Sequence, residues 1–89
     1  MTKLQHNKPK YFEIQYLNSK SSIIPFLKGI YEPKAGDKIM EIGSAEGGVL
    51  KAFTDLGCIC TGIELSPHRV KLANEFMKPE IDKGLISFR

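Results

Sequence analysis

One segment, Lys38 to Glu64, restricts the possible folds of this chain more than any other. In it, a short apolar strand runs into a glycine-rich turn, followed by a helix-forming stretch and a second apolar strand that ends at Glu64. A turn at the start of a helix leaves backbone N–H groups without intrahelical partners, and such groups attract polar and anionic ligands. The second strand brings a carboxylate to the same edge of the sheet. The segment therefore predicts a binding unit for a nucleoside-like cofactor.

The glycines of the turn have separate physical reasons to be there. Gly43 follows the first strand directly, and glycine adopts backbone angles that are forbidden to residues with a Cβ. Gly47 and Gly48 lie at the start of the helix, where each glycine costs roughly 1 kcal/mol relative to alanine. Their placement indicates close contact with a ligand or a neighbouring strand. An ordinary strand-to-helix turn without a ligand is the alternative.

Glu64 strengthens the prediction of a cofactor site. It lies 21 positions after Gly43 (64 − 43), near the offset of about 20 at which dinucleotide-binding folds place an acid on the ribose hydroxyls. An ionised carboxylate can accept hydrogen bonds from both hydroxyls of a ribose. Without the glycine turn, a solvated carboxylate at a loop edge would be the better interpretation of Glu64.

The type of cofactor is indicated by the residues around Gly43. The dinucleotide fingerprint G-x-G-x-x-G fits poorly, because Ala45 stands where the second glycine should admit a pyrophosphate. The run from Glu41 to Gly47 instead resembles the first motif of class I S-adenosylmethionine-dependent methyltransferases: an acid, any residue, glycine, any residue, glycine or alanine, any residue, glycine. The segments 33–38 and 62–67 resemble the lead-in and the second motif of that family. A dinucleotide-binding module of an oxidoreductase remains the alternative.

The resemblance covers residues 33–77 and implies S-adenosylmethionine as the cofactor. The small residues of the loop would lie along its methionine part, Glu64 would bind the ribose, and Leu65 would lie against the adenine. Glu41 would organise the loop and favour the ammonium group of the cofactor. The resemblance assigns no role to Glu46, and it implies no catalytic and no metal-binding residue. The implied cofactor-binding residues are Glu41, Gly43, Ser44, Ala45, Gly47, Glu64 and Leu65.

The expected fold class is α/β, a Rossmann-like parallel sheet with helices on its faces. Three strands, near residues 39–42, 58–63 and 85–88, alternate with helices at 49–56 and from 67 onward. The first helix is expected to bury one apolar stripe (Val49, Leu50, Phe53 and Leu56) and to be followed by a left-handed Gly57. Ser66 and Pro67 signal the start of the next helix. Right-handed crossovers then give the strand order 3-2-1, the first half of a methyltransferase sheet. We expect a single partial domain over residues 1–89, with an N-terminal helical segment (1–36) and a cofactor-binding half (37–89).

The N-terminal segment predicts two short helices. One covers residues 11–17, and a second begins at Ser21 or Ser22, with Pro25 in its first turn and Pro33 after its end. The aromatic residues of the first helix are candidates for a lid over the cofactor, with core packing as the favoured alternative. These residues are Tyr11, Phe12 and Tyr16.

The length of the chain limits the activity that it is expected to have. Family members have a sheet of seven strands, and the residues that contact adenine and acceptor follow the third and fourth strands. At 89 residues, this chain is expected to be the N-terminal part of a larger methyltransferase and inactive by itself. The open edge of the first strand is expected to promote self-association. A truncated, non-catalytic fragment is the alternative.

Composition excludes several classes of protein. Hydrophobic residues make up 42% of the chain and charged residues 26%, values that fit neither a disordered nor a membrane-spanning protein. No secretory signal is recognisable, so a cytoplasmic location is expected. Cys58 and Cys60 alternate on one strand and are expected to pack as small apolar groups rather than to form a disulfide or bind zinc.

The net charge of +3 is concentrated in the N-terminal part of the chain. Residues 1–40 hold seven lysines and three acids (+4), whereas residues 41–89 hold six basic residues and seven acids (−1). The lysines at positions 3, 8 and 10 are interpreted as a solvated tail. Nucleic-acid binding is not indicated, because arginine occurs only as Arg69 and Arg89. The methyl acceptor cannot be identified from the sequence, and a small molecule is favoured.

Overall fold

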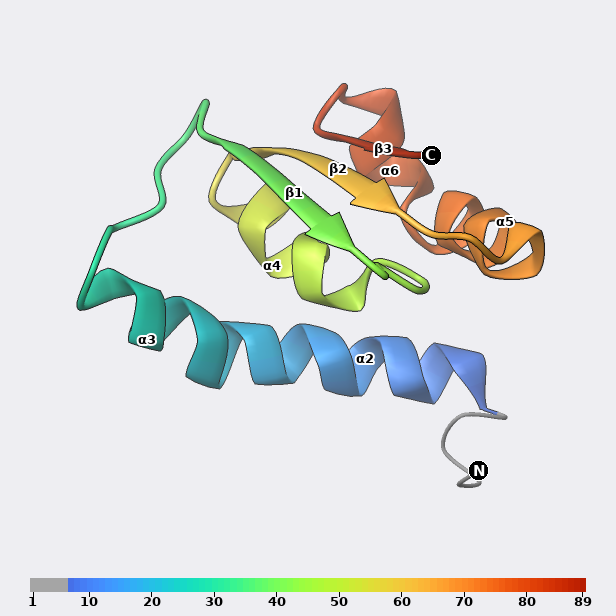
Figure 1. The fold of residues 1–89 in the computed structure, drawn as a ribbon, viewed down its shortest axis with the longest axis horizontal. Coiled ribbons are helices and arrows are strands. Elements are labelled where there is room, and N and C mark those ends of the chain that lie inside the picture. Colours follow the sequence, from blue (N-terminus) through green and yellow to red (C-terminus); the bar gives the residue numbers. More distant parts are fainter. Residues whose placement is uncertain (1–6) are drawn as a thin grey trace.

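A computed structural model describes residues 7–89, so the predictions made for the N-terminal tail at Lys3 lie outside the described residues. The chain forms a three-stranded parallel sheet in the order β1-β2-β3, with helices packed against it (Figure 1). This order confirms the prediction of a Rossmann-like half-sheet. The strands are β1 (Lys38–Ile42), β2 (Ile59–Ile63) and β3 (Ile86–Phe88).

The buried core lies on one face of this sheet. Ile39 of β1 pairs with Cys60 of β2, which in turn pairs with Ile86 of β3. Because side chains alternate between the two faces of a strand, these three residues point to the same side. They meet apolar side chains of the helices there, and the largest of those are Leu50, Phe53 and Met77.

Helix α4 (Gly48–Asp55) follows the glycine loop and covers this face (Figure 1). Of the apolar stripe expected from spacing, Leu50 and Phe53 are buried and Val49 is half-buried, whereas Leu56 after the helix end is 36% exposed. Gly57 has a φ of +87°, which confirms its prediction as a left-handed residue after the helix. Cys58 and Cys60 are both buried and free, as predicted.

Two further helices connect β2 to β3: α5 (Pro67–Phe76) and α6 (Lys78–Asp82). The predicted start of α5 is confirmed, because the Ser66 side chain accepts a hydrogen bond from the backbone N–H of Arg69 at 3.3 Å and Pro67 occupies the first turn. Between the two helices, Met77 is fully buried against the core. Helix α5 begins three residues after Glu64, so its first turn lies at the carboxyl end of β2, where the cofactor is expected.

The N-terminal segment differs from the two separate helices that we predicted. Helix α2 (Lys8–Asn18) continues through a π-helical turn, η1 (Ser19–Ile23), into α3 (Ile24–Lys28). Ser21 does not start a helix, since its hydroxyl donates to the carbonyl of Leu17 at 2.8 Å. Pro25 explains the π-helical turn: its ring would clash with a carbonyl of the preceding regular turn, and a wider turn accommodates it.

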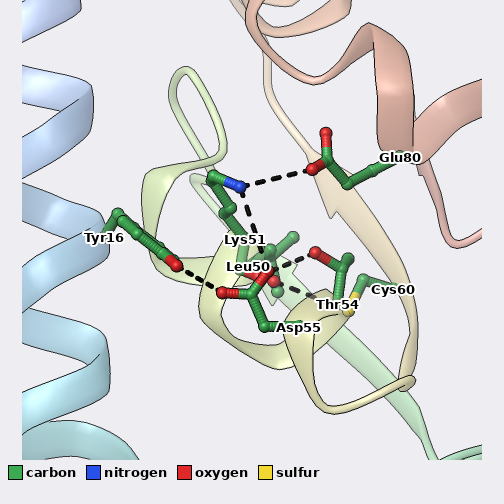
Figure 2. Close-up of polar contacts among 7 residues, drawn as sticks. All are labelled: Tyr16, Leu50, Lys51, Thr54, Asp55, Cys60 and Glu80. Atoms are coloured by element: carbon green, nitrogen blue, oxygen red, sulfur yellow. Dashed lines mark hydrogen bonds and ion pairs between the residues drawn. The ribbon is translucent and has the colours of Figure 1, made fainter.

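Helix α2 packs against α4, on the far side of α4 from the strands (Figure 1). Figure 2 shows how polar side chains join the helices: Lys51 of α4 lies 3.3 Å from Glu80 of α6 and 3.9 Å from Asp55. The hydroxyl of Tyr16 on α2 donates to the same Asp55. The ring of Phe12 contacts that of Phe76, with centroids 5.2 Å apart. Phe12 and Tyr16 therefore pack against the core, which supports the favoured alternative to a lid.

The opposite face of the sheet is largely uncovered in the described residues. Met40 and Ile42 of β1 point to that face and are 65% and 81% exposed. No described strand pairs with the outer edge of β1. Parallel sheets are normally buried on both faces. The apolar area that β1 exposes is therefore unusually large for a parallel strand. Among residues 7–89, no helix combines the length and the apolar character that a membrane span requires.

Candidate functional site

The loop between β1 and α4 has a regular backbone pattern. Gly43, Ala45 and Gly47 have φ values of +76°, +52° and +91°. These are the three small positions of the predicted motif, so each of them stands where the chain takes a left-handed conformation. Ala45 is the only residue other than glycine with a positive φ in the described chain. Its small side chain limits the strain of this conformation without removing it.

The backbone amides of this loop are less available than we expected. The N–H groups of Gly43 and Ser44 both donate to the carbonyl of Ile63, at 2.7 and 3.1 Å. The N–H of Ala45 donates to a carboxylate oxygen of Glu64 at 2.8 Å. These three amides lie before the helix start and are not available to a ligand, because the loop folds onto the end of β2 and satisfies them there.

Glu64 joins three parts of the site. One oxygen of its carboxylate accepts from Ala45 N–H, and the other accepts from Ser66 N–H at 3.0 Å. The hydrogen bond from Ser66 is the largest cause that lowers the pKa of Glu64, followed by that from Ala45 and the charge of Arg69. The carboxylate is therefore held in its ionised form. An ionised carboxylate has about four acceptor positions, so Glu64 can also accept hydrogen bonds from a ligand.

Two polar atoms at the carboxyl end of β1 and in the loop after it are buried without a hydrogen-bond partner: Oε1 of Glu41 and Oγ of Ser44. Ser44 lies against Gly62, where an added Cβ would meet its Oγ at 2.6 Å, and Gly62 is the residue that pairs with Glu41 across the sheet. Burial raises the pKa of Glu41. A buried oxygen without a partner is unfavourable, so both atoms suit a ligand that brings hydrogen-bond donors or positive charge.

The exposed part of the site lies at Gly43 and Leu65. Nothing lies within 4 Å of a Cβ added to Gly43, and Leu65 is 94% exposed. An apolar side chain exposed beside Glu64 is available to an adenine ring, but that contact remains a prediction. The described residues form no enclosed pocket at this edge. The candidate site is an open surface at the carboxyl ends of β1 and β2.

Sequence reasoning missed two neighbours of the loop. Phe88 of β3 fills the space beside Gly47 and Gly62, since a Cβ on either glycine would come within 2.7 Å of its ring. Gly48 has a different neighbour, because its missing side chain makes room for α2 and an added Cβ would meet the Phe12 carbonyl at 2.5 Å. The glycines of the helix start thus have close contacts, as predicted: Gly47 contacts the neighbouring strand β3, and Gly48 contacts helix α2. An aromatic residue at the end of the third strand was the available signal for Phe88.

The position of Lys8 differs from the one that we expected. It was interpreted as part of a solvated tail, but it begins α2, and its ammonium lies 3.9 Å from the carboxylate of Glu46 in the loop. Arg69 of α5 reaches the same carboxylate at 3.7 Å. Basic residues from two helices therefore meet at the loop between β1 and α4.

Comparisons with known proteins show which fold the chain shares. No protein-family model matches the chain, and no curated protein is significantly similar to it. Solved structures do match. A SAM-dependent methyltransferase from Thiobacillus denitrificans in complex with S-adenosyl-L-homocysteine has 24% identity and a TM-score of 0.61, covering 91% of this chain and 36% of that one. A SAM-dependent methyltransferase from Aquifex aeolicus has 15% identity and a TM-score of 0.65, covering 91% and 44%.

A third match is geranyl diphosphate methyltransferase in complex with SAM, with 24% identity and a TM-score of 0.59, covering 78% of this chain and 29% of that one. The chain thus spans between 29% and 44% of these three proteins. It has the Rossmann-like fold found in part of class I S-adenosylmethionine-dependent methyltransferases.

Proposed function

We propose that this chain binds S-adenosylmethionine and forms the N-terminal, cofactor-binding part of a methyltransferase. One observation carries the proposal: the Glu64 carboxylate is fixed on the glycine loop by Ala45 N–H and Ser66 N–H, at 2.8 and 3.0 Å. It is thereby held ionised at the strand end where a ribose would bind. Two of the matching structures were solved with SAM or S-adenosyl-L-homocysteine, which supports the same cofactor class.

The buried oxygens of Glu41 and Ser44 that lack hydrogen-bond partners support binding of the cofactor at this surface. S-adenosylmethionine carries an ammonium group and a sulfonium, and Glu41 offers a buried oxygen without a donor. Ser44 offers a hydroxyl that can donate or accept. The residues present therefore fit a cationic nucleoside better than they fit the pyrophosphate of a dinucleotide, for which Ala45 leaves less room than glycine.

The reaction itself needs little from the protein beyond alignment. The methyl group of S-adenosylmethionine is already activated by its sulfonium, so transfer is a displacement that depends on the position of the acceptor. This chemistry requires no covalent nucleophile, and the site residues that we assign are binding residues. We assign cofactor binding to this chain and favour a small-molecule acceptor, since the sequence has no interleaved arginine and aromatic pattern for nucleic acid.

Calorimetric titration of the 89-residue chain tests the proposal. We expect binding of S-adenosyl-L-homocysteine and none of NADH. Glu64→Ala should weaken that binding by about 1.5–3 kcal/mol, the usual contribution of hydrogen bonds to a charged group. Glu32→Ala, which replaces an exposed acid in the connection before β1, is the matched control and should bind as the natural chain does.

Each outcome separates the candidates. Binding of NADH in preference to S-adenosyl-L-homocysteine would favour the oxidoreductase alternative. Binding of neither compound, by a chain whose circular dichroism shows it to be folded, would favour a non-catalytic fragment. Unchanged affinity in Glu64→Ala would remove Glu64 from the site.

A further inference from the structure

Glu46 is a charged residue in a place where charge is unfavourable. It lies in the cofactor loop between Ala45 and Gly47, and its side chain is 0% exposed. Neither of its carboxylate oxygens has a hydrogen-bond partner among the described residues. Burying a carboxylate without hydrogen bonds is strongly unfavourable unless nearby charges compensate for it. The burial of Glu46 therefore calls for an explanation that involves its charge.

The compensating charges come from two helices that are distant in sequence. Lys8 is the first residue of α2, and its Nζ lies 3.9 Å from Oε2 of Glu46. Arg69 lies in the first turn of α5, and its Nε lies 3.7 Å from the same oxygen. Both distances are those of ion pairs, too long for hydrogen bonds. Glu46 is thus the point at which α2 and α5 meet the loop.

The connection to Glu64 runs through α5. The N–H of Arg69 donates to the Ser66 side chain at 3.3 Å, and the N–H of Ser66 donates to Glu64 at 3.0 Å. The first turn of α5 is therefore bound to Glu64 on one side and to Glu46 on the other. A change in the position of Arg69 would move the backbone that holds the Glu64 carboxylate.

The connection to α2 has a second support. Gly48, two residues after Glu46, lets α2 approach so closely that an added Cβ would meet Gln15 at 2.7 Å. Helix α2 therefore contacts the loop through Lys8 at its start and the first residue of α4 through its middle. A helix held to a loop by close packing and an ion pair is expected to respond when a ligand fixes that loop.

We propose that Glu46 is a positioning residue that couples the docking of α2 and α5 to the shape of the cofactor loop. This inference rests on the proposed function for its ligand. It implies that cofactor binding stabilises the docked position of α2 and that docking of α2 raises the affinity for the cofactor, because such coupling is reciprocal. The helix α2 acts on the cofactor through Glu46 and does not need to touch it.

Three variants of the full chain test the coupling: Glu46→Gln, Lys8→Met and Arg69→Met. Glu46→Gln keeps the shape of the buried side chain and removes its charge. The two cations are partly exposed, so their replacement is compatible with folding. Lys10→Met, which changes an exposed lysine on the same helix, is the control. Affinity for S-adenosyl-L-homocysteine is measured by calorimetry, and amide hydrogen exchange of α2 is measured with and without that ligand.

We expect Glu46→Gln to weaken binding about tenfold, within the usual range for coupled sites. Ligand addition should slow exchange in α2 of the natural chain, and this response should be lost in Glu46→Gln. Lys8→Met and Arg69→Met should weaken binding as well, and adding Lys8→Met to Glu46→Gln should cause little further loss, because both remove the same interaction. Lys10→Met should behave as the natural chain does.

Unchanged affinity and a retained exchange response in Glu46→Gln would overturn the inference, as would additive effects of Glu46→Gln and Lys8→Met. The exchange of α2 without ligand is a separate readout. It should be faster in Glu46→Gln than in the natural chain, and equal rates would overturn the inference even if no ligand binds. Absence of binding by the natural chain, together with faster exchange in Glu46→Gln, would refute the proposed function and leave the coupling of α2 to the loop established.

Discussion

The carboxylate of Glu64 accepts a hydrogen bond from the backbone N–H of Ala45, 19 positions earlier in the chain, at 2.8 Å. Ala45 has a φ of +52°, a conformation that costs a residue with a Cβ about 1–2 kcal/mol. The hydrogen bond therefore holds the loop in a conformation that its central residue does not prefer. The same bond orients the acid that we assign to the ribose.

Ala45→Gly should not destabilise the protein, in contrast to most alanine to glycine changes. Glycine removes the strain at φ +52° but increases the freedom of the unfolded chain by about 0.4–1 kcal/mol. We expect the free energy of unfolding to be unchanged or to rise by up to about 1 kcal/mol. Urea unfolding measures it.

Ala52→Gly is the matched control for this prediction. Ala52 is also buried but lies inside α4, where glycine should cost about 1 kcal/mol. If Ala45→Gly destabilised the chain as much as Ala52→Gly does, the strain assigned to Ala45 would have no energetic effect.

Gly48→Ala should destabilise the protein, although alanine is the better helix former. The added Cβ would meet the Phe12 carbonyl at 2.5 Å, and such overpacking typically costs about 1–3 kcal/mol. Gly29→Ala is the comparison, because Gly29 has a φ of −71° and its nearest contact is an ordinary 3.4 Å. That change should be neutral or stabilising by up to about 1 kcal/mol. Equal effects of the two changes in urea unfolding would contradict close packing of α2 on Gly48.

Glu41 should make the unliganded chain less stable at neutral pH than under acidic conditions. Burial raises the pKa of Glu41 in the folded state. Its contribution to stability is therefore fully present below the ordinary pKa of glutamate and is lost as the pH rises through the raised value. Glu41→Gln should accordingly stabilise the unliganded chain at neutral pH and have little effect in acid. Urea unfolding at the two pH values checks this, and a less stable variant at neutral pH would contradict it.

Cofactor affinity should depend on the charge of Glu41 in the opposite direction. If the ammonium group binds near the ionised carboxylate, affinity for S-adenosyl-L-homocysteine should fall as acid protonates Glu41. Glu64, whose pKa is lowered by hydrogen bonds from Ser66 and Ala45, stays ionised to lower pH. Glu41→Gln should bind more weakly at neutral pH and lose the pH dependence, as measured by calorimetry.

The exposed face of β1 should cause the chain to self-associate. Met40 is 65% exposed on a strand whose outer edge has no partner among the described residues, and a lysine on such a strand opposes pairing. We expect light scattering to show a mass that rises with concentration, and Met40→Lys to reduce this rise. Leu17→Lys changes an apolar residue of α2 that is 50% exposed and should leave it unchanged. A constant monomer mass for the natural chain would contradict the prediction.

Much of the fold follows from local sequence patterns. The apolar spacing of Leu50 and Phe53, the cap at Ser66 and the glycine at position 57 each predict a boundary or face by themselves, and each is found in the structure. The offset between Gly43 and Glu64 likewise predicts that loop and acid meet at one edge. These features depend on residues close in sequence or on the standard geometry of a parallel sheet.

Other features depend on contacts that no local pattern encodes. A charged side chain is usually exposed, so the burial of Glu46 becomes understandable only when Lys8 and Arg69 are brought to it by two helices. The hydrogen bonds of the Gly43 and Ser44 amides were not predicted, because the position of the Ile63 carbonyl could not be inferred from the sequence. The continuous N-terminal helix was missed because Ser21 and Pro25 are common at helix starts, whereas here a π-helical turn precedes the proline.

The two cysteines provide a chemical probe of local opening of the core between α4 and the sheet. Both thiols are buried, and burial raises the pKa of Cys60 to about 12, so almost none of it is thiolate at neutral pH. Since only the thiolate reacts with alkylating reagents, the folded chain should resist labelling at this position. The rate at which iodoacetamide modifies Cys60 should then rise with the fraction of molecules in which α4 and the sheet are separated, and a bound cofactor should slow it.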